Sequence, residues 1–407
     1  MRRVVVTGMG IVSSLGQSIG SAFERLKVLR NCIEASEDLA LYRGLQTCLC
    51  APCHFEKPSA YTRKVVRTMS PVSVMALAAT EQALEQAGLL GDPFVKGGRL
   101  GVAYGSCSGS VESNADFYTV LMNREVKNVT SATYIKMMAH TCAVNLSVHL
   151  GTTGRLLPTG TACTSGSLAI GQAYEAIAWG RQDAMIAGGA EEFSATQVAV
   201  FDTLFATSRR NGSPELTPRA FDSERDGLVI GDGAATLILE ERERAIARGA
   251  TIFAEVVGFG ENTDGRHVTQ PNAETQAQAI RLALEDAKLS PEDIRYVNAH
   301  GTATELGDIA EATALSHVFG THRPAVSTLK SYTGHTLGAC GAIEAAMTIE
   351  MLRHGWFAPN LNLVNPDPRC GGHDFIMGEG RTAEMEFAMS NNFAFGGVNT
   401  SLIFRRP

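Results

Sequence analysis

One cysteine near the middle of the chain stands where a thiol can act as a nucleophile. Cys163 lies in the stretch GTACTSGS and precedes a helix expected over residues 164–180. Free N–H groups at the start of a helix face such a thiol, so we expect its pKa to be lowered and the thiolate to be favoured. The small residues around it leave room for a substrate. A buried cysteine at a helix start is more often structural, so this assignment depends on the segments that follow.

Two histidines lie in glycine- and threonine-rich turns that can present an imidazole to a cleft. His300 ends an apolar strand in VNAHGTATELGD, and His335 lies in STLKSYTGHTLGACG. Lys330 stands between an apolar strand and the second turn, which predicts partial burial and an acidic partner, with Glu311 as the candidate. The simpler alternatives are a core histidine satisfied by the backbone and a lysine at the surface.

A glycine-rich turn near the C-terminal end can supply hydrogen-bond donors. The segment MSNNFAFGGVNTSLIF turns at Gly396 and Gly397. Exposed backbone N–H groups in this turn could form an oxyanion hole. An ordinary hairpin turn is the alternative.

Other motifs that could bind a metal or a cofactor are weak. The stretch CLCAPCH places Cys48, Cys50, Cys53 and His54 together, but no second pair of ligands follows. We therefore read these cysteines as apolar fillers and expect no metal site. GMGIVS lacks the third glycine of a dinucleotide-binding turn, and the chain contains no phosphate-binding GxxxxGK[ST] loop. We expect no bound cofactor.

The elements that must position these residues alternate between short apolar strands and longer Ala- and Leu-rich helices. This alternation predicts an α/β fold with largely parallel sheets. Two sequence pairs recur in the same order, ALEQAGL with ALEDAKL and GLVIGDGAATLILEE with NFAFGGVNTSLIFRR. The recurrence predicts a duplicated unit. Its N-terminal half, 1–250, contains the cysteine, and its C-terminal half, 251–407, contains both histidines and the lysine.

The composition excludes several classes of protein. A chain of 407 residues with 44% apolar and 19% charged residues is globular, and a net charge of −7 argues against general nucleic-acid binding. No apolar run approaches the roughly 18–20 residues of a membrane span, and the opening MRRVVVTGMG is typical of a strand, not of a secretory signal. Nine cysteines without such a signal favour a reducing compartment, which we expect to be the cytoplasm.

The motif set TACTSG, NAHGTATELGD, KSYTGHTLGACG and NNFAFGGVN, in that order and spacing, resembles the elongating β-ketoacyl-acyl carrier protein (ACP) synthases. The likeness extends from RRVVVTGMGIVSSLG at the start to SLIF at the end. It implies the thiolase fold, in which two similar α/β halves form five αβαβα layers. It also implies a decarboxylative Claisen condensation with malonyl-ACP, in fatty acid synthesis or in a specialised polyene or polyketide pathway. Such proteins form homodimers, or heterodimers with a related ketosynthase.

The resemblance assigns a role to each motif residue. Cys163 would be the nucleophile, and His300 and His335 would drive decarboxylation. Lys330 and Glu311 would form the ion pair of the family. The other implied residues are Phe395, a gate whose N–H joins that of Cys163 in the oxyanion hole, and Thr302 and Thr304, which would line the pantetheine channel. Because the imidazoles must be neutral to donate hydrogen bonds to a carbanion without quenching it, activity is expected to fall at low pH.

Less specific residues govern acyl-chain preference and carrier docking. Ser108 and Leu228 stand near positions that shape the acyl pocket, and RDGL replaces the RDGF common in relatives, which reshapes the pocket. Phe201 and Gly396 are further substrate-binding candidates. The phosphopantetheine-bearing carrier is acidic and needs a basic landing site, for which the candidates are Arg63, Lys64, Arg67, Arg124, Lys127, Arg209 and Arg210. The alternative function is a binding role, as the partner of another ketosynthase chain.

Overall fold

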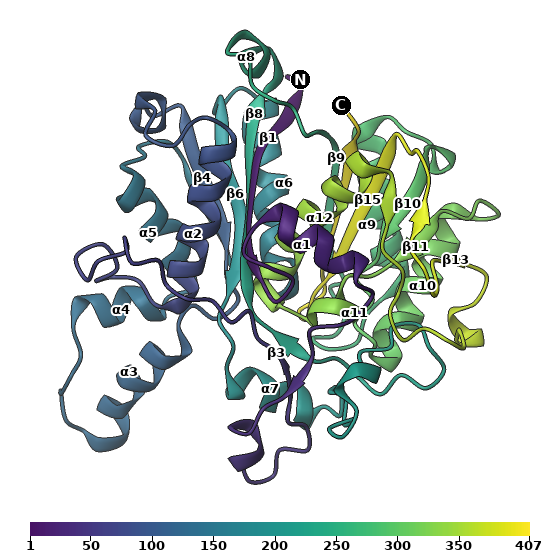
Figure 1. Ribbon diagram of the computed structural model, residues 1–407, viewed down its shortest axis with the longest axis horizontal. Helices are drawn as coiled ribbons and strands as arrows, with labels where there is room; N and C mark the ends of the chain where they lie inside the picture. The colour runs from purple at the N-terminus through teal and green to yellow at the C-terminus, as the bar shows by residue number, and fades with distance from the viewer.

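The computed structural model describes all 407 residues, and its central feature is a sheet of 11 strands (Figure 1). In the order in which they lie side by side, the strands are β13 (Asp374–Phe375), β11 (Ala325–Ser327), β10 (Ile294–Asn298), β15 (Phe387–Phe393), β16 (Val398–Arg405), β9 (Ala254–Thr263), β1 (Val4–Ser13), β8 (Gly233–Glu241), β6 (Ala184–Glu191), β4 (Leu100–Gly105) and β5 (Leu156–Thr159). Apart from the short β13, the order is a mirror image about the β9–β1 pair. The pairing directions match too, because β4–β6 and β10–β15 are parallel while β1–β8 and β9–β16 are antiparallel.

Helices cover the outer faces of this sheet and fill the space between its halves (Figure 1). The outer helices are α2 (Pro71–Gln86) and α5 (Thr141–Leu150) on the first half and α9 (Ala273–Ala287) and α10 (Glu305–Phe319) on the second, and the inner helices are α6 (Ser165–Ala178) and α12 (Cys340–His354). One hydrophobic cluster joins the inner helices to both half-sheets, and separate clusters lie under each outer pair. This succession is the five-layered αβαβα arrangement of the thiolase fold, so the expected duplicated fold is confirmed.

Glycines set the same strand–helix contact in both halves. A Cβ at Gly10 of β1 would lie 2.0 Å from Ala79 O of α2. A Cβ at Gly260 of β9 would lie 2.1 Å from Ala279 O of α9. No side chain fits at either position, so only glycine lets these helices approach their strands so closely. The two helices lead into ALEQAGL and ALEDAKL, the recurring pair that predicted the duplication.

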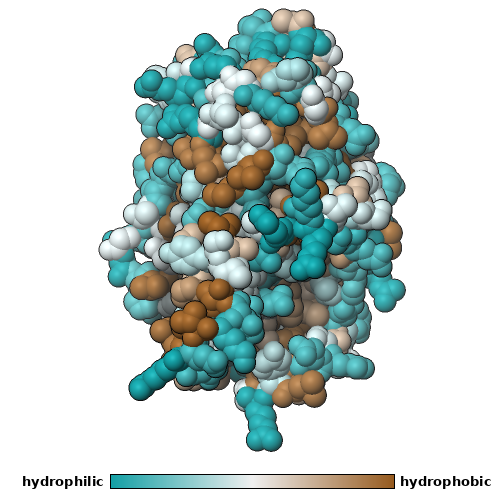
Figure 2. Space-filling view, turned by 90° about the vertical axis from the view of Figure 1, so that its left-hand side faces the viewer, coloured by the Kyte–Doolittle hydropathy of each residue, from teal (hydrophilic) through white to brown (hydrophobic).

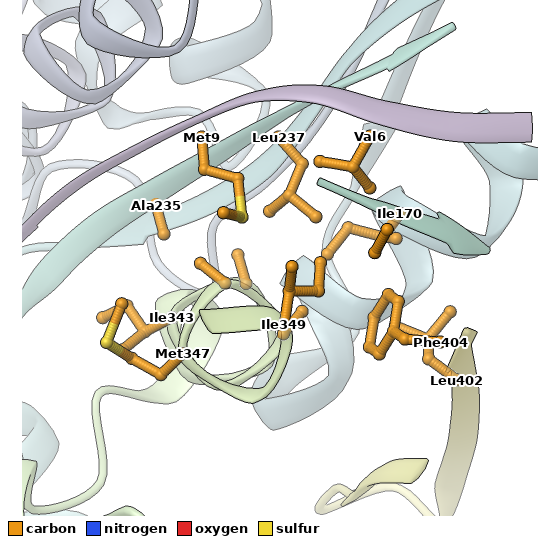
Figure 3. Packing of buried hydrophobic residues seen from close by; sticks show 14 of the residues in the cluster. Val6, Met9, Ile170, Ala235, Leu237, Ile343, Met347, Ile349, Leu402 and Phe404 are labelled. Carbon is orange, nitrogen blue, oxygen red and sulfur yellow. The ribbon is translucent and has the colours of Figure 1, made fainter. Parts of the chain in front are cut away.

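The inner helix α12 lies at the centre of the packing. All of its residues except the last two are buried. Figure 3 shows Ile343, Met347 and Ile349 of this helix among apolar side chains from β1, β8, α6 and β16. The inner helices begin side by side, since a Cβ at Gly166 of α6 would lie 2.9 Å from the amide nitrogen of Ala342 of α12. The close crossing fixes the turns that precede the two helices relative to each other.

Smaller elements hold the loops around the inner helices. A second sheet consists of β2 (Glu34–Ala35), β3 (Leu49–Ala51) and β7 (Ile230–Gly231). The remaining elements are α1 (Ile19–Lys27), α3 (Val111–Asn123), α4 (Ser131–Met137), α7 (Ala195–Thr203), α8 (Arg242–Ala247), α11 (Lys330–Thr333) and the strand pair β12 (Trp356–Phe357) and β14 (Arg381–Thr382). No helix has the length and apolar character that crossing a membrane requires.

Candidate active site

Cys163 lies on a tight turn at the start of α6, in the layer between the two half-sheets. It belongs to the 3₁₀ turn η3 (Ala162–Thr164), and only 4% of the residue is exposed. Ala162 has a φ of 50°, a left-handed backbone conformation that residues with a side chain rarely adopt. Leu337 has a φ of 45° in the matching turn before α12. Each half therefore has a strained residue at the start of its inner helix, and such strain is common at functional sites.

Both predicted histidines lie beside the Cys163 thiol. His335 Nε2 is 3.0 Å from Cys163 Sγ, although the two residues are 172 positions apart in the sequence. One nitrogen of each imidazole and the sulfur all lie within 4.8 Å of one another. The centroids of the two imidazole rings are 5.3 Å apart, and the ring planes are nearly perpendicular, at 87°. The three side chains thus share one space, in which they can act on the same group.

Different elements hold the two imidazoles. The backbone N–H of His335 donates to Val229 O at 2.6 Å, and Ile230 of β7 forms a β-bridge with His335. His300 follows β10, and its backbone N–H donates to Glu311 Oε1 at 2.8 Å. Asn392 Nδ2 of β15 approaches His300 Nδ1 to 3.5 Å, which favours the tautomer with the proton on Nε2.

Burial, and not the helix start, dominates the ionisation of Cys163. Burial raises the pKa of the thiol to about 11, while the charge of Lys330 and the backbone N–H groups of Phe395 and Cys163 act in the opposite direction. The expected lowering of the pKa was wrong, because removing the sulfur from water outweighs the favourable donors around it. The resting protein therefore holds a thiol, which must lose its proton in order to react.

Both imidazoles are uncharged at neutral pH. Burial lowers the pKa of His300 and of His335 well below the ordinary value of 6.5, and the charge of Lys330 lowers both further. A neutral imidazole can donate one N–H and accept at the other nitrogen. The two rings therefore offer hydrogen bonds to a developing negative charge without delivering a proton to it.

Two backbone N–H groups act on the sulfur, one from Phe395 and one from Cys163 itself. Two backbone donors beside a thiol are the groups from which an oxyanion hole could be built. Neither glycine of the turn contributes a donor, since the N–H of Gly396 donates to Val268 O at 2.8 Å and that of Gly397 to Ala394 O at 3.0 Å. The expectation of exposed glycine N–H groups was therefore wrong, and Gly396 serves the shape of the turn.

Lys330 forms a buried ion pair with Glu344 and not with Glu311. Its Nζ is 2.5 Å from Glu344 Oε1, and the two side chains are 1% and 2% exposed. Glu344 Oε2 also accepts from Asn392 Nδ2 at 2.7 Å. Glu311 instead accepts two backbone N–H groups of the loop after β10. The expected pairing was wrong because the carboxylate of Glu311 faces that loop, whereas Glu344 lies on α12 where it meets α11.

The sequence contained a signal for Glu344 that was overlooked. Glu344 is the one charged residue in the stretch CGAIEAAMTI, which is apolar on all sides of the helix. A carboxylate in such a helix is buried and needs a cation nearby. Asn392, which contacts both Glu344 and His300, carries no comparable signal, because a single asparagine in a strand has many ordinary roles.

A cavity of 440 Å³ leads to Cys163, His300 and His335. Thr302 and Thr304 line it, as expected for a channel, and their hydroxyl oxygens are 2.9 Å apart. Four apolar residues of its lining are exposed at the surface, namely Leu204, Phe205, Val268 and Leu306. A long, flexible group that carries a thioester can therefore enter from the surface and reach the thiol.

The apolar wall of the cavity beside Cys163 contains Phe201 and Leu228, as expected. The rings of Phe201 and Phe395 lie 5.0 Å apart, so Phe395 forms part of the same wall. Ser108 does not line this cavity, and its N–H donates to the buried Glu191 at 3.2 Å. Of the two residues expected to shape the acyl pocket, only Leu228 borders this cavity.

Comparison with known proteins identifies the family of this chain. The family model of the beta-ketoacyl synthase N-terminal domain matches residues 1–245, and the family model of the C-terminal domain matches residues 253–364. The chain belongs to the beta-ketoacyl synthase family. It is 39% identical to a 3-oxoacyl-[acyl-carrier-protein] synthase 2 of Vibrio cholerae over 412 residues, which cover 100% of this chain and 99% of the relative.

Solved structures of ketosynthases have the same fold. The crystal structure of a beta-ketoacyl synthase from Burkholderia phymatum is similar with a TM-score of 0.98 and 56% identity, and 100% of both chains are covered. A second neighbour is AntDE:AntF, a type II PKS acyl-carrier protein in complex with its ketosynthase. That similarity has a TM-score of 0.89 at 29% identity and covers 100% of this chain and 99% of the other.

The residues predicted to dock a carrier protein differ in their surroundings. Arg209 stacks over the ring of Phe205 at 5.4 Å and so lies at the mouth of the cavity. Arg210 is already engaged, with Asp226 at 3.5 Å. The other candidates are exposed and do not line the cavity: Arg63, Lys64, Arg67, Arg124 and Lys127.

Proposed function

We propose that this chain condenses an acyl group, held as a thioester on Cys163, with malonyl-ACP and releases CO₂. The proposal is carried by one observation: a thiol, two neutral imidazoles and two backbone N–H donors meet at the end of a single cavity. The relative from Vibrio cholerae is named for the synthesis of 3-oxoacyl-ACP, the product of such a condensation. Because this chain has the thiol and both imidazoles, catalysis is favoured over a role as a partner subunit alone.

In the first half-reaction, the Cys163 sulfur attacks the thioester carbonyl of an acyl-ACP. Its proton moves to His335 Nε2, 3.0 Å away, and then to the departing pantetheine sulfur. The N–H groups of Phe395 and Cys163 stabilise the oxyanion, and a donor of this kind contributes about 3 kcal/mol. Thr302 and Thr304 hold the pantetheine, while Phe395 moves to admit the acyl chain past its ring.

In the second half-reaction, malonyl-ACP loses CO₂ and negative charge develops on its thioester oxygen. The neutral rings of His300 and His335 donate hydrogen bonds to that oxygen. The enolate carbon then attacks the acyl carbonyl on Cys163, the C–S bond breaks, and the sulfur takes up a proton from solvent. The Lys330–Glu344 pair places a cation near the sulfur while adding no net charge to the buried site.

The formation of the acyl-enzyme gives a direct test of this proposal. The purified full-length chain is incubated with acyl-ACPs of different chain length, and its intact mass is measured. We expect one added acyl group per chain, mapped to Cys163 by peptide analysis, and 3-oxoacyl-ACP after malonyl-ACP is added. Absence of acylation with every acyl-ACP tested would contradict the proposal, and acylation at another cysteine would contradict the role of Cys163.

Decarboxylation of malonyl-ACP is expected to be insensitive to pH around 6.5. Because burial holds the pKa of both imidazoles well below that value, they stay neutral, and the rate should fall only at distinctly lower pH. The rate of release of CO₂ between about pH 5.5 and 8 measures this. A rate that halves near 6.5 would contradict it.

The free energy of unfolding should meanwhile decrease below pH 6.5, because histidines in the unfolded chain take up protons that the buried ones do not.

Leu228→Phe is expected to shorten the range of acyl groups that the protein accepts. Leu228 is 3% exposed and packs with Cys163 and Phe201. The phenyl ring of the variant is larger than the leucine side chain and must therefore occupy part of the cavity. Acylation by long-chain acyl-ACP should decrease about 10-fold or more, while acetyl transfer and malonyl decarboxylation change less than about twofold. Leu363→Phe, at a buried leucine of the α10 cluster, controls for overpacking. Equal loss with short and long acyl groups would contradict the prediction.

Reversing the charges of Arg63, Lys64 and Arg67 is expected to raise KM for acyl-ACP about 10-fold with little change in kcat. The three side chains are exposed and can attract an acidic carrier before any chemistry takes place. Turnover of an acyl-pantetheine, which has no protein part, should be unchanged. Arg295→Glu, an exposed arginine on β10, is the matched control. Equal loss on both substrates would contradict a docking role.

We propose that the chain works as a dimer, either with a second copy or with a related ketosynthase. Strand β5 is an edge of the main sheet, and Leu156 on it is 39% exposed. Figure 2 shows apolar side chains gathered on one face of the molecule. The exposed apolar side chains of α3, α4 and the segment between them are Tyr118, Leu121, Met122, Val126 and Tyr134. Edges and patches of this kind are usually covered by a partner. Light scattering of the purified chain should report twice the monomer mass if the partner is a second copy.

We also propose that the chain divides near residue 250 into the two halves expected from the sequence, 1–250 and 251–407. This boundary lies between α8 and β9, the first strand of the second half of the sheet.

A further inference from the structure

The chain contains one group of three side chains that could hold a metal ion, and it is formed by Cys163, His300 and His335. Their ligand atoms lie within 4.8 Å of one another, and all three residues are buried at the end of a cavity that opens to the surface. A thiolate and two imidazoles with an open fourth position are the ligands of a Cys/His₂ zinc site. The same three side chains can therefore bind a metal ion as well as the acyl substrates.

We propose that Cys163, His300 and His335 bind one thiophilic divalent cation, such as Zn²⁺, and that the bound ion inhibits acyl transfer. Only the inhibition rests on the function proposed above, whereas the binding does not. The ion would replace the proton of the Cys163 thiol, and that proton would be released to solvent. The resulting thiolate would then be a ligand and no longer a nucleophile.

The distances suit such an ion. Zinc–sulfur bonds of about 2.3 Å and zinc–nitrogen bonds of about 2.0–2.1 Å place tetrahedral ligand atoms roughly 3.2–3.7 Å apart. His335 Nε2 is 3.0 Å from Cys163 Sγ, so small rotations of the two side chains would admit the ion. His335 Nδ1 is buried without a hydrogen-bond partner, so this ring can place its proton there and present Nε2 as a ligand.

The surroundings limit the strength of binding without preventing it. The positive charge of Lys330 is offset by Glu344 at 2.5 Å. His300 Nδ1 faces Asn392 Nδ2 at 3.5 Å, and a metal-bound imidazole requires an acceptor at that position. Loss of such an outer hydrogen bond weakens metal binding by about 10–100-fold. We therefore expect a site that zinc occupies reversibly, released by a chelator.

The ligand types also determine which ions bind. Thiolate and imidazole select zinc, cobalt and similar ions over the hard cations Mg²⁺ and Ca²⁺, which require oxygen ligands. The other cysteine-rich stretch, CLCAPCH, does not form such a site. Cys50 Sγ points to Glu34 O at 3.8 Å, and Cys53 Sγ contacts Met75 Sδ at 3.4 Å.

Cobalt and zinc titrations of the untagged, metal-free, full-length chain test the proposal. Co²⁺ should produce a thiolate-to-cobalt charge-transfer band with a stoichiometry of one, and Zn²⁺ should remove that band. Cys163→Ser should abolish the band, and His335→Ala should weaken binding by at least about 10-fold. The control Cys48→Ser combined with His54→Ala, both outside the cavity, should bind as the wild type does. Mg²⁺ should have no effect on the band.

Two results would overturn the proposal. One is the absence of a thiolate band at saturating Co²⁺, and the other is a band that persists in Cys163→Ser. In an acyl-transfer assay, Zn²⁺ should inhibit and a chelator should restore the rate, while prior acylation of Cys163 should block metal binding. If no acyl-enzyme forms but the cobalt band appears and depends on Cys163, the proposed function fails and the metal site stands.

Discussion

We expect Cys163→Ala to lower the rate of acyl transfer from acyl-ACP by at least about 10³-fold, while decarboxylation of malonyl-ACP continues. The substitution removes the only atom that bonds to the acyl group. It leaves in place the two imidazoles, which act on the malonyl oxygen. The variant should keep its fold, because alanine fits where a small buried side chain stands. Intact-mass measurement of acylation and release of CO₂ from malonyl-ACP follow the two half-reactions separately.

The matched control is Cys370→Ala, a fully buried cysteine in the cluster under α9 and α10. It should acylate like the wild type, with a similar Tm. If Cys163→Ala still forms an acyl-enzyme, the nucleophile is another residue. If both half-reactions disappear together with the folded state, the loss is due to unfolding of the variant. Cys163→Ser is then tested instead, since a hydroxyl keeps the volume of the site.

His300→Ala and His335→Ala are each expected to lower malonyl decarboxylation about 10²–10³-fold. Each variant removes one hydrogen-bond donor to the oxygen on which charge develops, and burial makes that donor strong. Acylation of Cys163 should separate the two variants. It should slow in His335→Ala, where the contact of 3.0 Å with the sulfur is lost, and change less in His300→Ala.

The control for both variants is His317→Ala, an exposed histidine near the end of α10 whose side chain is 46% exposed. It should leave both half-reactions unchanged. Full decarboxylation in either active-site variant would show that this imidazole does not stabilise the enolate. A loss of acylation alone in both would restrict the imidazoles to proton transfer from the thiol.

The amino-acid sequence by itself determined the family and the fold class, and it predicted Cys163, His300 and His335 as the reactive residues. Cys163, His300 and His335 could be predicted because each lies in a short turn rich in glycine or threonine, whose local geometry depends on neighbouring residues in the chain. The duplication could be predicted for a similar reason. The contact of Gly10 with α2 and that of Gly260 with α9 require the same small residues in both halves, so the sequence repeats itself there.

Only the tertiary structure decided how these residues are paired and charged. The partner of Lys330 is Glu344, because α11 and α12 bring these two side chains together, and no local pattern specifies that contact. The pKa of Cys163 rises to about 11 because the layers around it exclude water, whereas the sequence indicated only the helix start. Ionisation and pairing depend on what covers a side chain from all directions, and that covering comes from strands and helices far apart along the chain.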